Sequence, residues 1–193
     1  MLIIRERFQE LIELIPKFMA TSENSIKEAS AIIAKAFRDG NKVLLCGNGG
    51  SAADSQHFAA EFVNAFSRSI TRPGLPALAL TTDSSVMTSI GNDYSFDNVF
   101  SRQVQAYSKP GDILIVLTTS GSSVNCINAV LEAKKLGVRT IAFTRTDATI
   151  SQYVNMTIPV PSTNTQHIQE CHLLAYHVIT ELVEKELFEG ANS

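Results

Sequence analysis

The sequence has little that would suit it to nucleic acid or to a membrane. Its 193 residues carry a net charge of −3 and contain no block of Lys or Arg, so a basic surface for nucleic acid or anionic lipid is missing. No run reaches about 18 uncharged apolar residues, the length that a membrane-spanning helix needs. Arg5, Glu6 and Arg7 also interrupt the apolar stretch that a secretory signal peptide requires. We therefore expect a cytoplasmic protein that binds neither nucleic acid nor a membrane.

Cysteine is scarce, and its spacing excludes two common uses. The three cysteines, Cys46, Cys126 and Cys171, form no C-x-x-C pair of the kind that binds metals or exchanges disulfides. Each lies within an apolar or helical pattern, which predicts buried free thiols in a reducing compartment. The sequence also contains no internal repeat, low-complexity segment or linker. We expect a single domain over residues 1–193, since this length suits one large core.

Apolar residues alternate between helical and strand patterns along the chain. Two amphipathic helices are predicted before the sheet, from Leu2 to about Met19 and from about Ser25 to Gly40. Later helices are expected at about 51–66, 84–90, 98–107, 123–136 and 165–187, and strands at about 42–46, 77–80, 113–117, 140–143 and 156–160. Continuous apolar strands separated by helices are typical of a parallel sheet buried on both faces. The pattern predicts an α/β three-layer sandwich with a central parallel sheet and extra helices at both ends.

Polar loops follow two of the predicted strands. The first, Asn48 to Ser51, is rich in glycine, and the second, Thr118 to Ser123, carries five hydroxyl groups. Each opens a predicted helix, and the carboxyl ends of parallel strands meet at the edge where open α/β sheets bind ligands. Backbone N–H groups at a helix start and neighbouring hydroxyls suit a phosphate or a sugar. The two loops together favour a sugar-phosphate site, while the alternative is that Ser51 and Ser123 are simply N-cap residues.

Two nucleotide-binding motifs are excluded. Gly47, Gly49 and Ala52 have the G-x-G-x-x-A spacing of a dinucleotide fingerprint, but that motif needs an acidic residue about 20 positions later. The first acidic residue after the second strand, Asp83, comes 36 residues after Gly47. Neither loop contains the Gly-Lys-Ser/Thr of a Walker loop.

Two helices carry polar residues suited to chemistry. His57 and Glu61 are one turn apart, so their side chains share a face and suit a metal or acid–base role, the alternative being a solvated helix face. The last helix carries Gln169, His172 and His177 among apolar residues. His177 lies about 12 Å beyond Gln169 along the axis and about 80° round it. Either long side chains lean together, or different subunits contribute to one site.

These motifs together resemble the phosphoheptose isomerases of the sugar-isomerase (SIS) domain family. The resemblance covers nearly the whole chain and rests on 46–51, 57–61, 91–93, 119–123 and 168–170 with His172 and His177. It implies a flavodoxin-like SIS topology and an aldose–ketose isomerase acting through an enediol. The implied reaction converts sedoheptulose 7-phosphate into D-glycero-D-manno-heptose 7-phosphate, for lipopolysaccharide or another surface glycan.

The resemblance also implies one zinc ion per subunit and roles for individual residues. Glu61 would be the base and His177 the acid of the proton transfer. The implied zinc ligands are His57, Glu61, Gln169 and His177. The implied substrate-binding residues are Asn48, Gly49, Gly50, Glu61, Asn92, Asp93, Thr118, Thr119, Ser120, Ser123 and Gln169. The chain departs from the family pattern at His167 and at Ala65, where the family has Arg, which leaves Arg68 or Arg72 to compensate at the second position.

The two ends of the chain predict assembly, since their helices carry more apolar surface than one sheet face can cover. We expect residues 1–40 to pack between subunits and residues 41–193 to form the sheet core and the last helix. The resemblance implies a homotetramer with sites at subunit interfaces. Two alternatives are a related protein that binds the replication initiator DnaA, a group that lacks a Glu at the position of Glu61, and a sugar-phosphate sensor without catalysis. The presence of Glu61 favours the enzyme.

Overall fold

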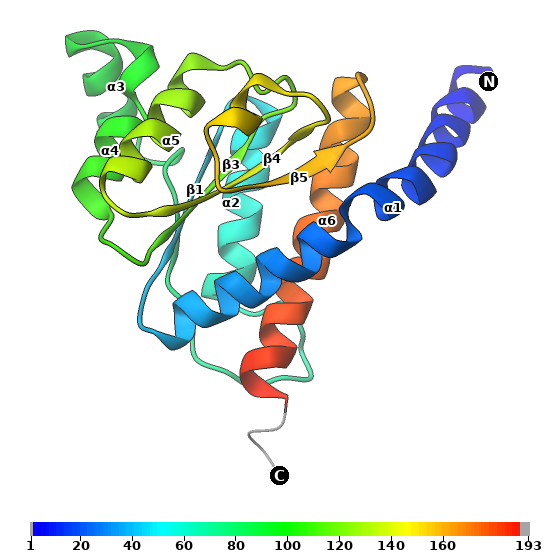
Figure 1. Cartoon of the computed structure of the whole chain (residues 1–193), viewed down its shortest axis with the longest axis horizontal. Coiled ribbons are helices and arrows are strands. Elements are labelled where there is room, and N and C mark those ends of the chain that lie inside the picture. Colours follow the sequence, from blue (N-terminus) through cyan, green and yellow to red (C-terminus); the bar gives the residue numbers. More distant parts are fainter. Residues whose placement is uncertain (1, 190–193) are drawn as a thin grey trace.

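A parallel five-stranded sheet lies at the centre of the computed structural model, which describes residues 2–189 (Figure 1). Its strands run in the order β2-β1-β3-β4-β5, and every neighbouring pair is parallel. The strands are β1 (Val43–Gly47), β2 (Ala77–Ala79), β3 (Ile113–Leu117), β4 (Arg139–Arg145) and β5 (Met156–Val160). The predicted parallel sheet is confirmed, and its strand order is that of flavodoxin-like folds, with a reversal between β1 and β3.

Helices cover both faces of this sheet (Figure 1). Every residue of β1 and β3 is buried, because alternate apolar side chains point into two separate cores. One core is closed by α1 (Leu2–Arg38), α2 (Gly50–Val63) and α6 (Thr165–Phe188). The other is closed by α3 (Ser84–Asp93), α4 (Ser101–Tyr107) and α5 (Val124–Lys135), with the short 3-10 turns η1 (Phe96–Asn98) and η2 (Thr149–Gln152). The three-layer sandwich is therefore confirmed.

The N-terminal segment is one helix, so the prediction of two was wrong. α1 runs unbroken from Leu2 to Arg38, with Pro16 and Ser25 inside it. The polar stretch between its two apolar parts does not end the helix, because Ser22 is buried and its hydroxyl donates to the carbonyl of Pro159 on β5 at 2.6 Å. Serine often ends or caps helices because its side chain competes for nearby backbone groups, and here the bond to β5 engages that side chain instead. A contact between α1 and the sheet thus replaces the expected break.

The first half of α1 projects from the rest of the subunit (Figure 1). Residues 2–10 are all exposed, and burial begins at Leu14 and Phe18. The exposed large apolar side chains of this half are Leu2, Ile3, Ile4, Phe8, Ile12 and Met19. Within residues 2–189, neither α1 nor another helix has the length and apolarity needed to cross a membrane.

The three cysteines are free and buried, as predicted. Cys46 at the end of β1 is in contact with Cys126 on α5, and this contact together with burial raises the pKa of Cys46. Burial also raises the pKa of Cys171 to about 11. Cys46 and Cys171 therefore stay as neutral thiols, and all three cysteines help to fill the core.

Candidate active site

The two polar loops begin side by side. β1 and β3 pair so that their last residues, Gly47 and Leu117, are level. A Cβ atom on Gly47 would lie 2.7 Å from the carbonyl oxygen of Leu117 and 2.8 Å from that of Ser51, which no side chain tolerates. Glycine thus allows β1, β3 and α2 to meet closely. Both loops start where the strand order reverses, the position at which open α/β sheets bind ligands.

Asn125, in the first turn of α5, joins the two loops. Its amide and that of Asn48 exchange two hydrogen bonds, in which each Nδ2 donates to the other Oδ1 at 2.9 Å. Asn125 is only 3% exposed. Asn125 lies two residues beyond the predicted loop and was not predicted as a site residue, since nothing in the local sequence distinguishes it.

The loop after β3 offers hydroxyl and N–H groups to a ligand. Thr118 is buried, and its Oγ1 accepts the N–H of Gly121 at 3.2 Å, which shapes the turn. Thr119 is half-buried and Ser120 exposed. Their backbone N–H groups have no hydrogen-bond partner within the described part of the chain. These donors suit the oxygen atoms of a phosphate.

The serines predicted as possible N-caps do not serve as caps. Ser123 occupies the N-cap position of α5, but its side chain makes no capping hydrogen bond. At the start of α2 the N-cap residue is Gly49, and Ser51 lies inside the first turn. Gly49 and Gly50 are both exposed, so a ligand can approach this helix start closely.

Three of the implied zinc ligands meet between α2 and α6. Nε2 of His57 lies 3.0 Å from Oε1 of Glu61 and 3.5 Å from Nε2 of His177. One possible ligand atom from each residue lies within 4.8 Å of the others. Two imidazoles and a carboxylate form a set that zinc uses in catalytic sites, where a further position is left for water or substrate. These residues, called the metal cluster below, fit a zinc ion.

Within the metal cluster, the pKa of His177 is shifted from its ordinary value. Burial, and then the neighbouring His57, lower its pKa, while Glu61 opposes this shift. Phe66, in the loop after α2, contributes to the burial with a ring centroid 5.7 Å from that of His177. A lower pKa favours the neutral imidazole, which is the form that binds metals.

Gln169 lies away from the metal cluster within the subunit. It packs against Gly50, where a Cβ atom would come within 2.6 Å of Nε2. Because Gly50 faces Gln169 just as His57 faces His177, α2 and α6 run side by side in the same direction. The two levels are about 10–12 Å apart along the helix axes. The structure therefore brings His57, Glu61 and His177 together and leaves Gln169 apart.

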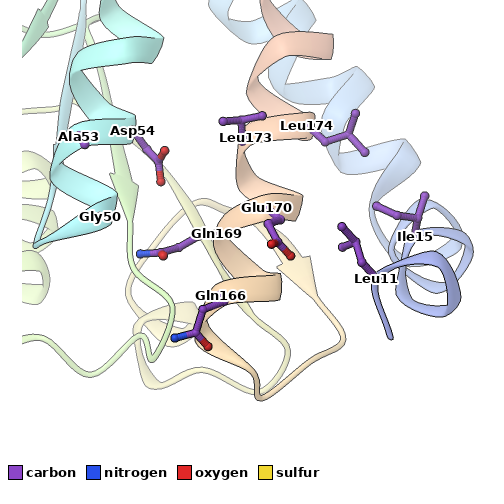
Figure 2. A pocket seen from close by; sticks show the side chains of 10 residues that line it. All are labelled: Leu11, Ile15, Gly50, Ala53, Asp54, Gln166, Gln169, Glu170, Leu173 and Leu174. Atoms are coloured by element: carbon purple, nitrogen blue, oxygen red, sulfur yellow. The ribbon is translucent and has the colours of Figure 1, made fainter. Parts of the chain in front are cut away.

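A cavity of about 720 Å³ opens beside Gln169 (Figure 2). The carboxyl group of Asp54 points into the space between α2 and α6, one turn before His57 on the same face of α2. Burial raises the pKa of Asp54, and His57 partly offsets that shift. The sequence analysis missed Asp54, although its spacing from His57 could have revealed it. The remaining lining residues are Leu11, Ile15, Gly50, Ala53, Gln166, Glu170, Leu173 and Leu174.

Asn92 and Asp93 lie on the other layer of the sheet, in the last turn of α3. Both are exposed, and Nδ2 of Asn92 donates to Oδ1 of Asp93 at 2.8 Å. Neither side chain hydrogen-bonds to the two loops or to the metal cluster among residues 2–189. Within one subunit, Asn92 and Asp93 are thus separate from the two loops and from the metal cluster.

Arg72 is already engaged within the fold. Its guanidinium is fully buried, with Nε 2.7 Å from Oε1 of the buried Glu184. It also donates to two carbonyl groups in the last turn of α2, including that of Glu61 at 2.8 Å. Arg72 therefore holds the end of α2 and is not free to replace the missing family arginine. Arg68 is exposed and could therefore take the place of that arginine.

His167, the second departure from the family pattern, connects α1 to α6. Its Nε2 lies 2.8 Å from Glu10, and its Nδ1 lies 2.7 Å from Glu170. The hydrogen bonds to Glu170 and then Glu10 raise the pKa of His167. Its side chain thus serves the packing of α1 rather than the metal cluster.

Comparison with known proteins identifies the family. Residues 7–145 match the SIS domain. A phosphoheptose isomerase of Aquifex aeolicus is 49% identical over 187 residues, which are 96% of this chain and 97% of that protein. The chain belongs to the phosphoheptose isomerase family of SIS-domain proteins. The resemblance inferred from the motifs is therefore confirmed.

Solved structures of phosphoheptose isomerases share the fold over nearly the full length. That of Francisella tularensis has a TM-score of 0.90 and 35% identity, covering 94% of this chain and 96% of its own. That of Neisseria gonorrhoeae has a TM-score of 0.88 and 37% identity, covering 94% and 97%. The predicted SIS fold is confirmed. Membership of this family makes the chain an isomerase, which also confirms the prediction of an enzyme.

Proposed function

We propose that this protein isomerises sedoheptulose 7-phosphate to D-glycero-D-manno-heptose 7-phosphate in the cytoplasm. This step would supply heptose for lipopolysaccharide or another surface glycan. The observation that carries the proposal is the convergence of His57, Glu61 and His177 in a member of the phosphoheptose isomerase family. The relatives from Aquifex aeolicus and Neisseria gonorrhoeae are themselves named for phosphoheptose isomerisation.

Glu61 and His177 supply the proton transfers that this reaction needs. In our proposal the Glu61 carboxylate takes a proton from C1 of the ketose, and a proton returns to C2 from the same face of the enediol. The His177 imidazole gives a proton to O2, which becomes negative as the enediol forms, and takes up the O1 proton when the enediol collapses to the C1 aldehyde. Positioned groups of this kind each contribute about 10²- to 10⁴-fold to the rate.

The donor set of the metal cluster suits one zinc ion per subunit. His57, Glu61 and His177 would hold the ion, which would supply Lewis-acid stabilisation of the developing enediolate. Within one subunit, Gln169 lies about two helical turns from the other three ligands. It would therefore complete the set only as a ligand from another subunit.

The two loops are proposed to hold the phosphate and the sugar hydroxyls. Asn48, Gly49 and Gly50 stand at the N-terminus of α2, whose N–H groups and dipole attract oxygen-rich ligands. The second loop contains no Lys or Arg, so binding would rely on N–H groups and hydroxyls. Its proposed contacts are Thr118, Thr119, Ser120 and Ser123.

We propose a homotetramer in which subunits complete one another's sites. Two observations support this assembly. The exposed half of α1 and the exposed Leu173, Leu174, Val178 and Leu182 on α6 leave an apolar surface without a partner in one subunit. The predicted substrate ligands Asn92, Asp93 and Gln169 also lie away from the metal cluster within that subunit. Packing by residues 1–40 would bury the apolar surface.

The test is turnover of sedoheptulose 7-phosphate by purified protein, with and without added zinc. We expect conversion by the wild type and a loss of about 10²- to 10⁴-fold in kcat for Glu61→Gln, because the amide cannot accept the proton. Conversion that persists in this variant would remove Glu61 as the base. Binding of the sugar phosphate by the wild type without conversion would instead favour a non-catalytic sensor.

A further inference from the structure

Tyr176 lies behind the metal cluster and contacts one of its members. Its hydroxyl oxygen is 2.8 Å from Nδ1 of His57. The ring is completely buried and stacks on Phe58, with centroids 5.0 Å apart and planes 18° apart. Phe58 follows His57 on α2, and Tyr176 precedes His177 on α6. This stacked pair therefore holds together the two helix segments that carry the histidines.

The contact determines which nitrogen of His57 is free. Nε2 faces the other members of the metal cluster, at 3.0 Å from Glu61 and 3.5 Å from His177. A neutral imidazole that binds a metal through Nε2 carries its proton on Nδ1. Metal-binding histidines nearly always donate that N–H to a neighbouring group. Among residues 2–189, the hydrogen-bond partner of Nδ1 is Tyr176.

A phenol hydroxyl suits His57 both with and without a metal. Without a metal, the hydroxyl can donate to Nδ1 while the N–H at Nε2 donates to Glu61. When Nε2 binds a metal, Nδ1 becomes the donor and the phenol oxygen accepts. Carbonyl and carboxylate oxygens can only accept, whereas a hydroxyl does either.

We propose that Tyr176 is a positioning residue that directs Nε2 of His57 toward the metal and pairs Nδ1 whether or not the metal is bound. The inference rests on the zinc site of the proposed function and adds to it a residue outside the ligand set. The Tyr176 hydroxyl acts through His57, because that contact uses the hydroxyl and the ring is buried.

The experiment compares Tyr176→Phe with the wild type in metal binding. Zinc affinity is measured on metal-free protein by competition with a chromophoric chelator, and we expect about 10- to 100-fold weaker binding in the variant. The visible absorption bands of the cobalt(II)-loaded protein should change as well, because they report the geometry of the ligands. The matched control is Tyr153→Phe, which removes a hydroxyl from a partly buried ring on the opposite face of the sheet. It should leave affinity and spectrum unchanged.

The outcomes separate this inference from the proposed function. A wild type that binds no zinc would contradict the zinc site itself. A wild type that binds zinc, with a Tyr176→Phe variant of equal affinity and an identical cobalt spectrum, would overturn the role of Tyr176. Thermal unfolding of the metal-free proteins identifies a variant that fails to fold. In that event, ¹H–¹⁵N spectra of histidine-labelled, zinc-loaded wild type decide: a proton on Nδ1 of His57 supports the inference, and a bare or metal-bound Nδ1 refutes it.

Discussion

Asn48 and Asn125 lie 77 positions apart in sequence and exchange two amide hydrogen bonds of 2.9 Å. The pair connects the loop after β1 to the first turn of α5, which follows the loop after β3. Since Asn125 is buried, its amide fixes the spacing of the two loops without being exposed to a ligand. The pair therefore joins the two loops into one surface, which the proposed function assigns to the sugar phosphate.

Loss of this pair should weaken substrate binding. In Asn125→Ala the Asn48 amide loses both bonds and can rotate, so we expect KM to rise by about tenfold, equivalent to one or two hydrogen bonds. Zinc affinity should stay as in the wild type, because the metal cluster lies elsewhere. Steady-state kinetics and chelator competition measure the two quantities.

The control for this prediction is Asn128→Ala. Asn128 lies on the same helix, one turn later, and its Nδ2 donates to the carbonyl of Asp97 in η1. A KM increase of equal size in both variants would show that α5 is perturbed generally and that the Asn48–Asn125 pair is not special.

Removal of Glu184 should destabilise the fold strongly. Glu184 accepts hydrogen bonds from Arg72 and from the backbone N–H groups of Phe66 and Ser67. Glu184→Gln leaves a buried guanidinium without its counter-charge, which costs about 3–5 kcal/mol and lowers Tm by roughly 6–20 °C for a chain of this size. Calorimetry measures the shift.

An exposed ion pair between α6 and α1 provides the comparison. Glu186 lies 3.2 Å from Arg38, and both side chains are substantially exposed. Glu186→Gln should change stability by less than about 1 kcal/mol, as is usual for surface pairs. Equal melting temperatures for the two variants would contradict the claim that the buried Arg72–Glu184 pair stabilises the fold more than a surface pair does.

His172 should make the protein sensitive to acid. Its ring is completely buried, and burial lowers its pKa to about 3. In the unfolded chain His172 has the ordinary histidine pKa near 6.5. Below that pH the unfolded chain therefore binds a proton at His172 that the folded protein does not bind. The free energy of unfolding therefore falls as the pH drops below about 6.5, and this group has no effect above that pH.

Replacing His172 tests this dependence. His172→Leu should flatten the fall in unfolding free energy between about pH 6.5 and 4.5, measured by urea denaturation in matched buffers. The carboxyl groups titrate alike in both proteins, so their contribution cancels in the difference. Parallel curves over this range would show that His172 becomes charged within the fold.

A charge on the projecting half of α1 should disrupt assembly. Phe8 is 69% exposed in the subunit, and the proposed tetramer would bury it. Phe8→Glu should therefore shift the protein to smaller species in sedimentation at micromolar concentration. Gln9→Glu adds the same charge one position along, on a different side of the helix, and should leave assembly intact. Unchanged sedimentation of the Phe8 variant would place the interface elsewhere.

The sheet and its loops could be predicted because local patterns determine them. Continuous apolar stretches identified β3 and β5 at their observed bounds, and a parallel sheet then placed both polar loops at one edge. Helix geometry alone also predicted that Gln169 and His177 lie about 12 Å apart along α6.

The remaining features depend on contacts between distant parts of the chain. Ser22 continues α1 because it meets β5, and Asn125 matters because it meets Asn48. In the sequence Tyr176 resembles any other aromatic core residue, and only the structure shows that its hydroxyl contacts His57. No local pattern distinguishes these residues from ordinary polar or aromatic positions, so they could not be predicted from sequence alone.

The level pairing of Gly47 with Leu117 has a consequence for anyone who redesigns this enzyme. A slip of one residue between β1 and β3 would move one loop past the other by about 3.3 Å and turn its strand's side chains to the opposite face. Exposed loop residues can be exchanged to suit another sugar phosphate as long as the two buried strands keep their register and Asn48 stays paired with Asn125. The register of the two strands thus sets the relative position of the loops. New specificity is best sought by grafting loops onto an unaltered sheet.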